Sequence, residues 1–265
     1  MNTPDFTEKI FDFRANGINS AFAVRIPKKR CDRAVLLISL ATDWYTALNN
    51  PDYKTVPDIF LSAGHNVASF DLPGHGSLID YCGEGIESWA KAMLKGVDVA
   101  EKIRNIGSKI IDICLEERLA WNQTVVMMGV SRGGFSVLHI MAYDRRVYAA
   151  AIHAPVIDLA ELREFRDVKE NDLVISSSGM NLIPFLASRF LFISMGQEDP
   201  RVDAKTCFEF FARLCASSKT VKPELFVLRG QTHGPTAYTH SAYSACASFL
   251  LGKIAIRINE KTHQD

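Results

Sequence analysis

Short apolar runs alternate with helix-like segments along most of the 265-residue chain. The apolar runs, each short enough for a strand buried on both faces, are 34–40, 66–70, 124–129, 149–153, 190–195 and 225–228. Helical patterning is found at 57–63, in a long amphipathic stretch from about 86 to 118, and at 135–143, 204–216 and 236–251. This alternation predicts an α/β fold, with a mostly parallel central sheet that helices cover on both faces.

The first part of the chain departs from this alternation. Segments 9–15 and 20–26 flank the dipeptide Asn16-Gly17, which is typical of a tight β-hairpin turn. An antiparallel pair therefore precedes the parallel strands, and the expected sheet has about eight strands. Because the sequence shows no internal repeat, low-complexity tract or interdomain linker, we expect residues 1–265 to form a single domain.

Residues 155–189 separate two predicted strands by a long interval. The segment leaves the carboxyl end of a strand, where the ligand-binding loops of α/β sheets gather. It carries Leu159-Ala160-Glu161-Leu162 and, later, Pro184. We expect a short, mostly helical lid here, and an ordinary long crossover is the alternative.

The composition excludes several classes of function. Lys plus Arg and Asp plus Glu both number 30, so the net charge of zero gives no electrostatic footprint for nucleic acid or an anionic membrane. The six cysteines are scattered without a Cys-x-x-Cys pair, which favours buried free thiols over disulfides or a zinc site. Neither a signal peptide nor an apolar stretch of membrane-spanning length is evident. We therefore expect a cytoplasmic protein without a metal.

A Gly-x-Ser-x-Gly motif lies between a predicted strand and a predicted helix, in the run 124–134 (TVVMMGVSRGG). Gly129 and Gly133 leave room for a tight strand-to-helix turn that exposes Ser131 above the edge of the sheet. Chance alone gives the motif in about one chain in fifteen of this size, so the flanking strand and helix carry the argument. The strand and the helix together predict that Ser131 is a nucleophile. The alternative is that Ser131 is only a residue of the turn.

A serine hydroxyl needs a base to take its proton, and the base needs a third group to orient it. Asp199 follows the apolar run at 190–195 and His233 follows the run at 225–228. Because parallel strands end at the same edge, both side chains are expected to meet Ser131. The order and placement predict a catalytic triad of Ser131, Asp199 and His233.

Each member of this triad has an alternative interpretation. Glu198 and Asp158 compete with Asp199 for the role of the acid. Asp199 is also suited to cap a helix that begins at Pro200. His233 is alternatively a capping or packing histidine.

The chain resembles proteins of the α/β-hydrolase fold, nearest to the esterase, dienelactone-hydrolase and prolyl-oligopeptidase-like branches. The matching segments are 71–76 (DLPGHG), 129–134 (GVSRGG), 196–199 (GQED) and 232–234 (THG). The resemblance covers nearly the whole chain. It implies the α/β-hydrolase fold and a hydrolase that uses neither a metal nor an organic cofactor.

The loop after the first parallel strand departs from the pattern of these relatives. Many of them carry His-Gly there, and a backbone amide of that loop completes the oxyanion hole. This chain has Ala41-Thr42 instead, and because a backbone amide does not depend on its side chain, either residue can still donate. The amide of Arg132, directly after the nucleophile, is the expected second donor.

Several side chains are candidates for the surroundings of the nucleophile. Trp44, Tyr45, His153 and Met180 are predicted to line the substrate pocket, with plain packing as the alternative for each. His75 is expected to hold its own loop together. The side chain of Arg132 is expected to pair with Asp71 or Asp144, and a substrate carboxylate is the alternative partner.

The predicted function is hydrolysis of a carboxylic ester or thioester of a small molecule, through an acyl-enzyme on Ser131. The same scaffold also fits an acyltransferase or lactonising enzyme, or a lyase that cleaves a carbon–carbon bond. A non-catalytic binding protein is a further alternative. Peptidase activity is less favoured, because no propeller-sized accessory domain is present to sort peptides.

Overall fold

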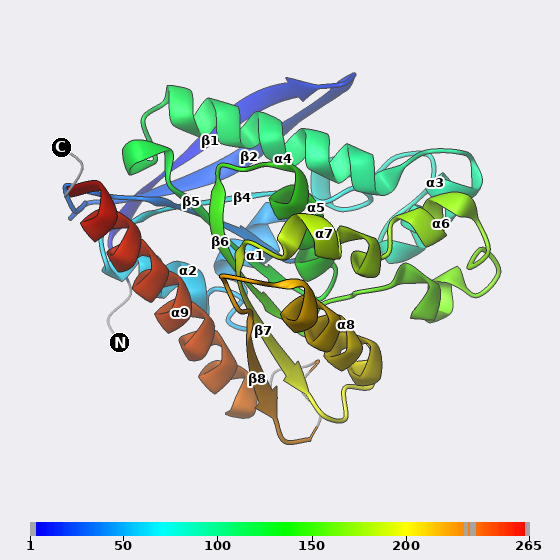
Figure 1. Ribbon diagram of the computed structural model, residues 1–265. Helices are drawn as coiled ribbons and strands as arrows, with labels where there is room; N and C mark the ends of the chain where they lie inside the picture. The colour runs from blue at the N-terminus through cyan, green and yellow to red at the C-terminus, as the bar shows by residue number, and fades with distance from the viewer. Residues whose placement is uncertain (1–3, 231–232, 234–236, 263–265) are drawn as a thin grey trace.

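A computed structural model describes residues 4–230, 233 and 237–262. Its strands form a single sheet in the order β1-β2-β4-β3-β5-β6-β7-β8 (Figure 1). Their bounds are β1 Phe6–Ala15, β2 Ile18–Pro27, β3 Leu36–Leu40, β4 Asn66–Phe70, β5 Val125–Val130, β6 Val147–His153, β7 Phe190–Gly196 and β8 Glu224–Leu228. Strands β3 to β8 are parallel and β1 and β2 are antiparallel, which confirms the predicted mostly parallel α/β sheet.

The hairpin turn forms where the sequence predicts it. Asn16 and Gly17 both have positive φ, at 47° and 80°, as a two-residue hairpin turn requires. The turn pairs Ala15 with Ile18 and fixes the register of β1 against β2. Strand β2 then pairs with β4, so the hairpin extends one edge of the parallel sheet.

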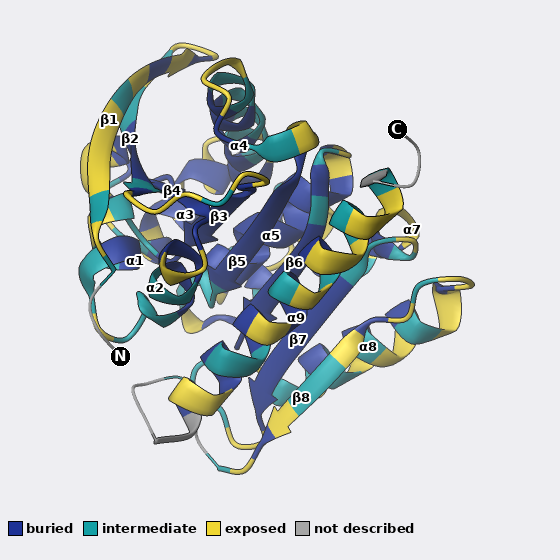
Figure 2. Cartoon of the chain, turned by 90° about the vertical axis from the view of Figure 1, so that its left-hand side faces the viewer, coloured by how far each residue is buried: buried dark blue, intermediate teal, exposed yellow. Residues whose placement is uncertain are grey.

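Helices cover both faces of the sheet (Figure 1). The bounds are α1 Trp44–Asn49, α2 Thr55–Ser62, α3 Ile86–Leu94, α4 Val99–Glu116, α5 Arg132–Tyr143, α6 Asp172–Ser176, α7 Ile183–Leu186, α8 Ala204–Ser217 and α9 Ala237–Thr262. Within β3, Leu36 and Ile38 belong to the buried cluster that includes residues of α3, α4, α5 and α8, whereas Leu37 belongs to the cluster that includes residues of α2 and α9. This alternation, with period two, explains why the central strands are mostly apolar and buried on both sides (Figure 2).

The helices differ from the sequence prediction at three places. The long amphipathic stretch at 86–118 is two helices, because Gly96, with φ of 80°, ends α3 and Asp98 caps α4 by accepting the Glu101 amide at 2.8 Å. Helix α9 continues past Leu251 to Thr262, since Gly252 lies inside it without breaking it. Helix α1 was not predicted, and the Asp43 carboxylate caps it by accepting the Thr46 amide.

The segment 155–189 folds into α6, α7 and three short 3₁₀ turns at 159–161, 163–165 and 179–182. Phe165, Val174 and Leu182 are buried in the core that lies on the α3–α5 face of the sheet. The segment contacts α3, α5 and α8, which are helices on that face of the sheet (Figure 1). Its role as a lid stays a prediction.

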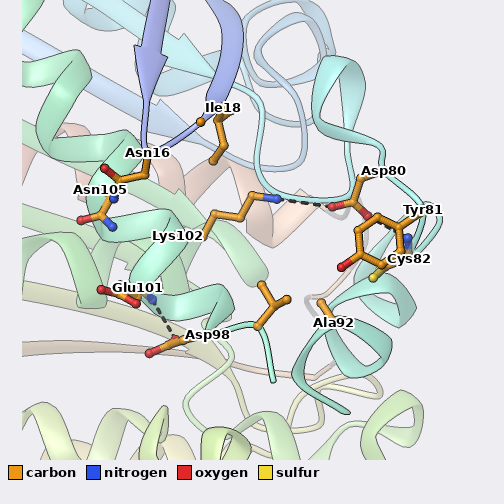
Figure 3. A pocket seen from close by; sticks show the side chains of 12 residues that line it. Asn16, Ile18, Asp80, Tyr81, Cys82, Ala92, Asp98, Glu101, Lys102 and Asn105 are labelled. Carbon is orange, nitrogen blue, oxygen red and sulfur yellow. Dashed lines mark hydrogen bonds and ion pairs between the residues drawn. The ribbon is translucent and has the colours of Figure 1, made fainter. Parts of the chain in front are cut away.

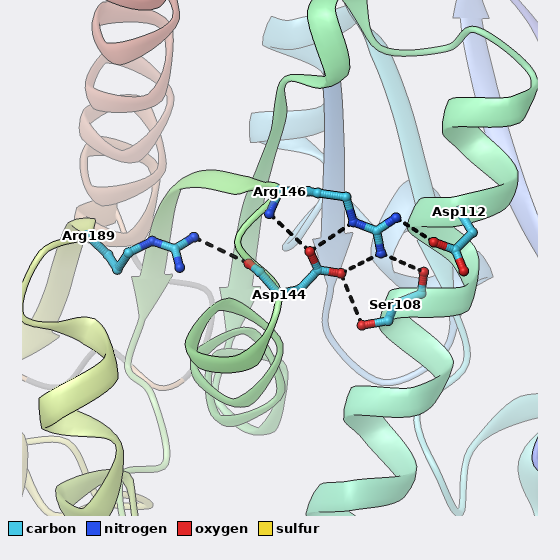
Figure 4. A network of polar contacts seen from close by, with 5 residues as sticks. All are labelled: Ser108, Asp112, Asp144, Arg146 and Arg189. Carbon is cyan, nitrogen blue, oxygen red and sulfur yellow. Dashed lines mark hydrogen bonds and ion pairs between the residues drawn. The ribbon is translucent and has the colours of Figure 1, made fainter.

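A network of charged side chains joins α4, α5 and the start of β6 (Figure 4). The Arg146 guanidinium donates to Asp144 Oδ1 at 2.9 Å and Oδ2 at 2.6 Å, and it also pairs with Asp112. Ser108 donates to Asp144 as well, at 3.0 Å. Burial alone would raise the pKa of Asp144, but these hydrogen bonds outweigh it and hold the pKa below its usual value.

We expect D144N to lower the free energy of unfolding by about 1–3 kcal/mol at neutral pH, because it leaves the Arg146 guanidinium without its buried carboxylate. Since the folded-state pKa of Asp144 is depressed, its contribution is complete above the ordinary aspartate value and declines as the pH falls below about 4. Urea unfolding at pH 7 and pH 3.5 measures both effects. R213Q, which removes an exposed i,i+4 ion pair in α8, is the control and is expected to lose less than about 0.5 kcal/mol. An equal loss in both variants would contradict this assignment.

Candidate active site

Ser131 occupies a strained turn between β5 and α5. Its backbone has φ of 55° and ψ of −116°, a conformation that side-chain-bearing residues rarely adopt. Three hydrogen bonds hold it there: its N–H donates to the His153 carbonyl at 2.9 Å, and its carbonyl accepts from Phe135 and Val156, both at 3.2 Å. The turn is therefore anchored to β6 and to the chain that follows β6.

Glycines allow the close approaches that shape this turn. A Cβ at Gly129 would lie 2.7 Å from the Gly134 nitrogen, which is shorter than real side chains tolerate. A Cβ at Gly133 would overlap the Leu40 carbonyl and lie 3.1 Å from the Ala41 nitrogen. The first turn of α5 thus rests directly on the end of β3, and only glycine fits there.

The three predicted triad residues come together at the carboxyl ends of β5, β7 and β8. Ser131 Oγ lies 3.2 Å from His233 Nε2, and His233 Nδ1 lies 3.1 Å from Asp199 Oδ2. The Asp199 side chain is fully buried, whereas His233 is 20% exposed. A hydroxyl, an imidazole and a carboxylate therefore form one hydrogen-bonded chain.

The Asp199 carboxylate is held for this contact by the turn that follows β7. Its Oδ1 accepts the amides of Arg201 at 2.8 Å and Val202 at 3.0 Å. Burial alone would raise the pKa of Asp199, but the hydrogen bond from His233 and these two amides lower it below its usual value. The carboxylate therefore stays ionised beside the imidazole at neutral pH.

The alternatives to Asp199 lie elsewhere in the structure. Glu198 is exposed, and Asp158 accepts the Ala160 amide and the Ser178 hydroxyl at the start of a 3₁₀ turn. No helix begins at Pro200, because α8 begins later and is capped by Asp203. Asp199 is thus the carboxylate that contacts His233.

The amides predicted to bind an oxyanion lie around the same turn. Arg132 is the first residue of α5, where a backbone N–H has no partner within the helix. Ala41 directly follows β3, beside Gly133. The next residue, Thr42, is fixed through its carbonyl, which accepts the Leu72 amide at 2.9 Å. Their role as donors stays a prediction.

The candidate pocket residues have different environments. Trp44 and Tyr45 open α1 with their rings in a T-shaped contact 5.7 Å apart, and Tyr45 is 63% exposed. His153 is buried, with its Nδ1 2.9 Å from the Ser194 hydroxyl. Met180 is half-buried against the core beneath the 155–189 segment. A pocket role for these four residues remains a prediction.

The Arg132 side chain differs from the prediction, because it pairs with neither Asp71 nor Asp144. Its guanidinium lies 2.6 Å from His75 Nε2, and within the described residues it forms no ion pair. The Asp71 carboxylate instead accepts the Trp44 amide at 3.0 Å and the amide of Ser77 at 2.7 Å. Asp144 is engaged in the Arg146 network at the opposite end of α5.

A cavity of about 410 Å³ lies away from Ser131 (Figure 3). It opens between the β1–β2 turn, residues 80–82 and the start of α4, and Asp80, Asp98, Glu101 and Lys102 contribute charges to it. Over the described part of the chain, no group of three or more His, Cys, Asp or Glu side chains is arranged to hold a metal ion. No described helix is both long and apolar enough to cross a membrane.

The strand order and the covering helices are those of the α/β-hydrolase fold, which solved structures share. The prolyl oligopeptidase family matches residues 107–256, more than half of the chain. The protein therefore belongs to that family, and it is a serine hydrolase. A comparison with curated proteins finds no match.

Solved structures share the fold at low sequence identity. A PEG-bound cold-adapted esterase from an Arctic intertidal metagenomic library is 16% identical, with a TM-score of 0.70 and coverage of 93% of both chains. An acylaminoacyl peptidase of Pyrococcus horikoshii is 14% identical with a TM-score of 0.71, and puromycin hydrolase is 17% identical with a TM-score of 0.71. The match covers 94% and 95% of this chain but 42% and 40% of those two chains.

We expect G133A to lower the free energy of unfolding by about 2 kcal/mol or more, because the new methyl group would overlap the Leu40 carbonyl. G252A is the matched control, since a Cβ there meets nothing within 4 Å inside α9. The control should gain about 0.5–1 kcal/mol from the better helix propensity of alanine. Urea unfolding measures both, and a G133A protein as stable as the parent would refute the close approach.

Proposed function

We propose that this protein hydrolyses carboxylic esters or thioesters of small molecules through an acyl-enzyme on Ser131. The observation that carries the proposal is the hydrogen-bonded chain from Ser131 through His233 to Asp199. It supplies a nucleophile, a base and the group that orients the base, which acyl transfer to a serine requires.

In the first step, Ser131 Oγ attacks the carbonyl carbon while His233 Nε2 takes the hydroxyl proton. The 3.2 Å separation is at the long end for this transfer and is expected to shorten when substrate binds. Asp199 accepts a hydrogen bond from the Nδ1–H of His233, which fixes the tautomer and stabilises the imidazolium. Because the pKa of Asp199 is lowered, the proton stays on the histidine.

The carbonyl oxygen becomes an oxyanion in the tetrahedral intermediate. The amides of Arg132 and of Ala41 or Thr42 are the proposed donors to it. When the intermediate collapses, the bond to the alcohol or thiol breaks and His233 protonates that leaving group. Water, deprotonated by His233, then attacks the acyl carbon, and the acid leaves as Ser131 regains its proton.

The preference for ester substrates is supported by the extent of the structural matches. The Arctic esterase is covered over 93% of its own length, whereas the acylaminoacyl peptidase is covered over 42%. Peptides are the second candidate substrates, because the family is named for oligopeptidases. The six free cysteines fit a reducing compartment, so we propose that the enzyme acts in the cytoplasm.

We expect S131A to lose at least about 10⁴-fold in kcat on p-nitrophenyl butyrate, because no other group can form the acyl-enzyme. Wild-type protein should react stoichiometrically with a fluorophosphonate probe, and S131A should not. S217A, at an exposed serine at the end of α8, is the control and should keep both properties. Turnover that persists in pure S131A would overturn the proposal. Turnover of an acyl-peptide p-nitroanilide by the same three proteins separates peptidase activity from esterase activity.

We expect D199N to lower kcat by about 10³–10⁴-fold, since an amide favours the wrong imidazole tautomer and leaves the imidazolium unpaired. E198Q, which alters the neighbouring exposed carboxylate, is the matched control. Initial rates on the same ester measure both variants. A larger loss in E198Q than in D199N would assign the acid to Glu198 instead.

A further inference from the structure

The Arg132 side chain extends from the residue that directly follows Ser131, and its guanidinium forms no ion pair with a carboxylate among the described residues. That residue is the first of α5, and the guanidinium is hydrogen bonded to His75 Nε2 at 2.6 Å. Charged side chains that are taken from water are normally paired, so this arrangement needs an explanation.

His75 is arranged to be a neutral partner for Arg132. Its Nδ1 lies 2.9 Å from the Pro73 carbonyl, so this nitrogen carries the proton and Nε2 is left to accept from Arg132. Burial, and then the charge of Arg132, lower the pKa of His75. A neutral imidazole orients the guanidinium but does not cancel its charge.

The residues around Arg132 do not cancel its charge either. Burial, and then the nearby charge of Arg201, lower the pKa of Arg132, although a guanidinium remains protonated at neutral pH. Arg201 lies two residues after Asp199 in the sequence, and its guanidinium donates to the Glu164 carboxylate at 2.7 Å. Glu164 also accepts from Arg163 at 3.2 Å. The Glu164 charge also acts on Arg132 and opposes the lowering of its pKa, but the ion pairs of Glu164 are formed with Arg163 and Arg201.

The carboxylates of the neighbouring loops are engaged with backbone groups. Asp43 accepts the Thr46 amide at 2.8 Å and the Thr42 hydroxyl at 3.0 Å. Asp71 accepts the amide and hydroxyl of Ser77, in addition to the Trp44 amide. None of these carboxylates pairs directly with Arg132, so among the described residues its guanidinium has a neutral hydrogen-bond partner and no ion-pair partner.

We infer that the natural substrate carries a carboxylate close to the scissile carbonyl, and that the Arg132 guanidinium binds it. The planar fork of arginine suits a carboxylate, and a charge-assisted hydrogen bond in a half-buried site is stronger than a neutral one. The substrate class is therefore the half-esters of short dicarboxylic acids, or short-chain esters of hydroxy acids. This inference rests on the proposed function, since it concerns the substrate of the same site.

The test compares esters that differ in one charge. The first pair is 4-nitrophenyl hydrogen glutarate and methyl 4-nitrophenyl glutarate, with the carboxylate on the acyl side. The second pair is 4-(butyryloxy)benzoate and its methyl ester, with the carboxylate on the leaving group. We expect wild type to favour the acid of at least one pair by about 10- to 100-fold in kcat/KM.

R132Q should bring that acid-to-methyl-ester ratio to about one, and R132K should retain part of the preference. R145Q is the matched control, because Arg145 is exposed at the opposite edge of the sheet, before β6, and its loss changes the net charge equally. The ratio should survive in R145Q. Equal preference for acid and methyl ester in wild type, or an unchanged ratio in R132Q, would overturn the inference while hydrolysis itself stands.

A binding measurement separates failure of this inference from failure of the proposed function. S131A protein is titrated calorimetrically with 4-nitrophenyl hydrogen glutarate and with its methyl ester. Tighter binding of the acid, lost in the S131A/R132Q double variant, supports the carboxylate site even if wild type hydrolyses neither ester. Equal binding of both compounds would reject the carboxylate site, whatever the turnover.

Discussion

The close approach of α5 to the end of β3 is the constraint on which the site depends. Gly133 lies so near the Leu40 carbonyl that no side chain fits between them. This contact sets where α5 begins, and therefore where Ser131 stands and where the amide of Arg132 points. Because the same contact brings Ala41 next to the turn, one packing interaction positions both Ser131, the proposed nucleophile, and the predicted oxyanion donors.

A second constraint holds the loops around this turn. The buried Asp71 carboxylate joins the loop after β3 to the loop after β4, through the amides of Trp44 and Ser77. Gly76 makes room for it, because a Cβ there would lie 2.8 Å from Asp71 Oδ1. The run 71–76 (DLPGHG) therefore has a structural role, because its Asp71 carboxylate accepts backbone amides from both loops. Its His75 imidazole orients the Arg132 guanidinium.

The sequence predicts much of this fold because its central strands are continuous apolar runs and because three chemically distinctive residues follow strand ends. What it could not predict depends on contacts between distant segments. The break at Gly96 requires knowing that Asp98 caps a new helix, and α9 passes Gly252 because tertiary packing outweighs a modest propensity. Pairing of Arg132 with His75 was missed since an acidic partner is the ordinary expectation for arginine, and Asp71 is already committed to backbone amides.

The choice of a neutral partner for Arg132 argues for function over stability. A carboxylate at position 75 would neutralise the guanidinium and reduce the free-energy penalty of burying it. It would also repel an anion, and its negative charge would oppose the oxyanion proposed to form at Ser131. With a neutral His75 as its partner, Arg132 keeps its positive charge available for the substrate carboxylate proposed above. Sites that give up local stability in this way are typical of functional positions.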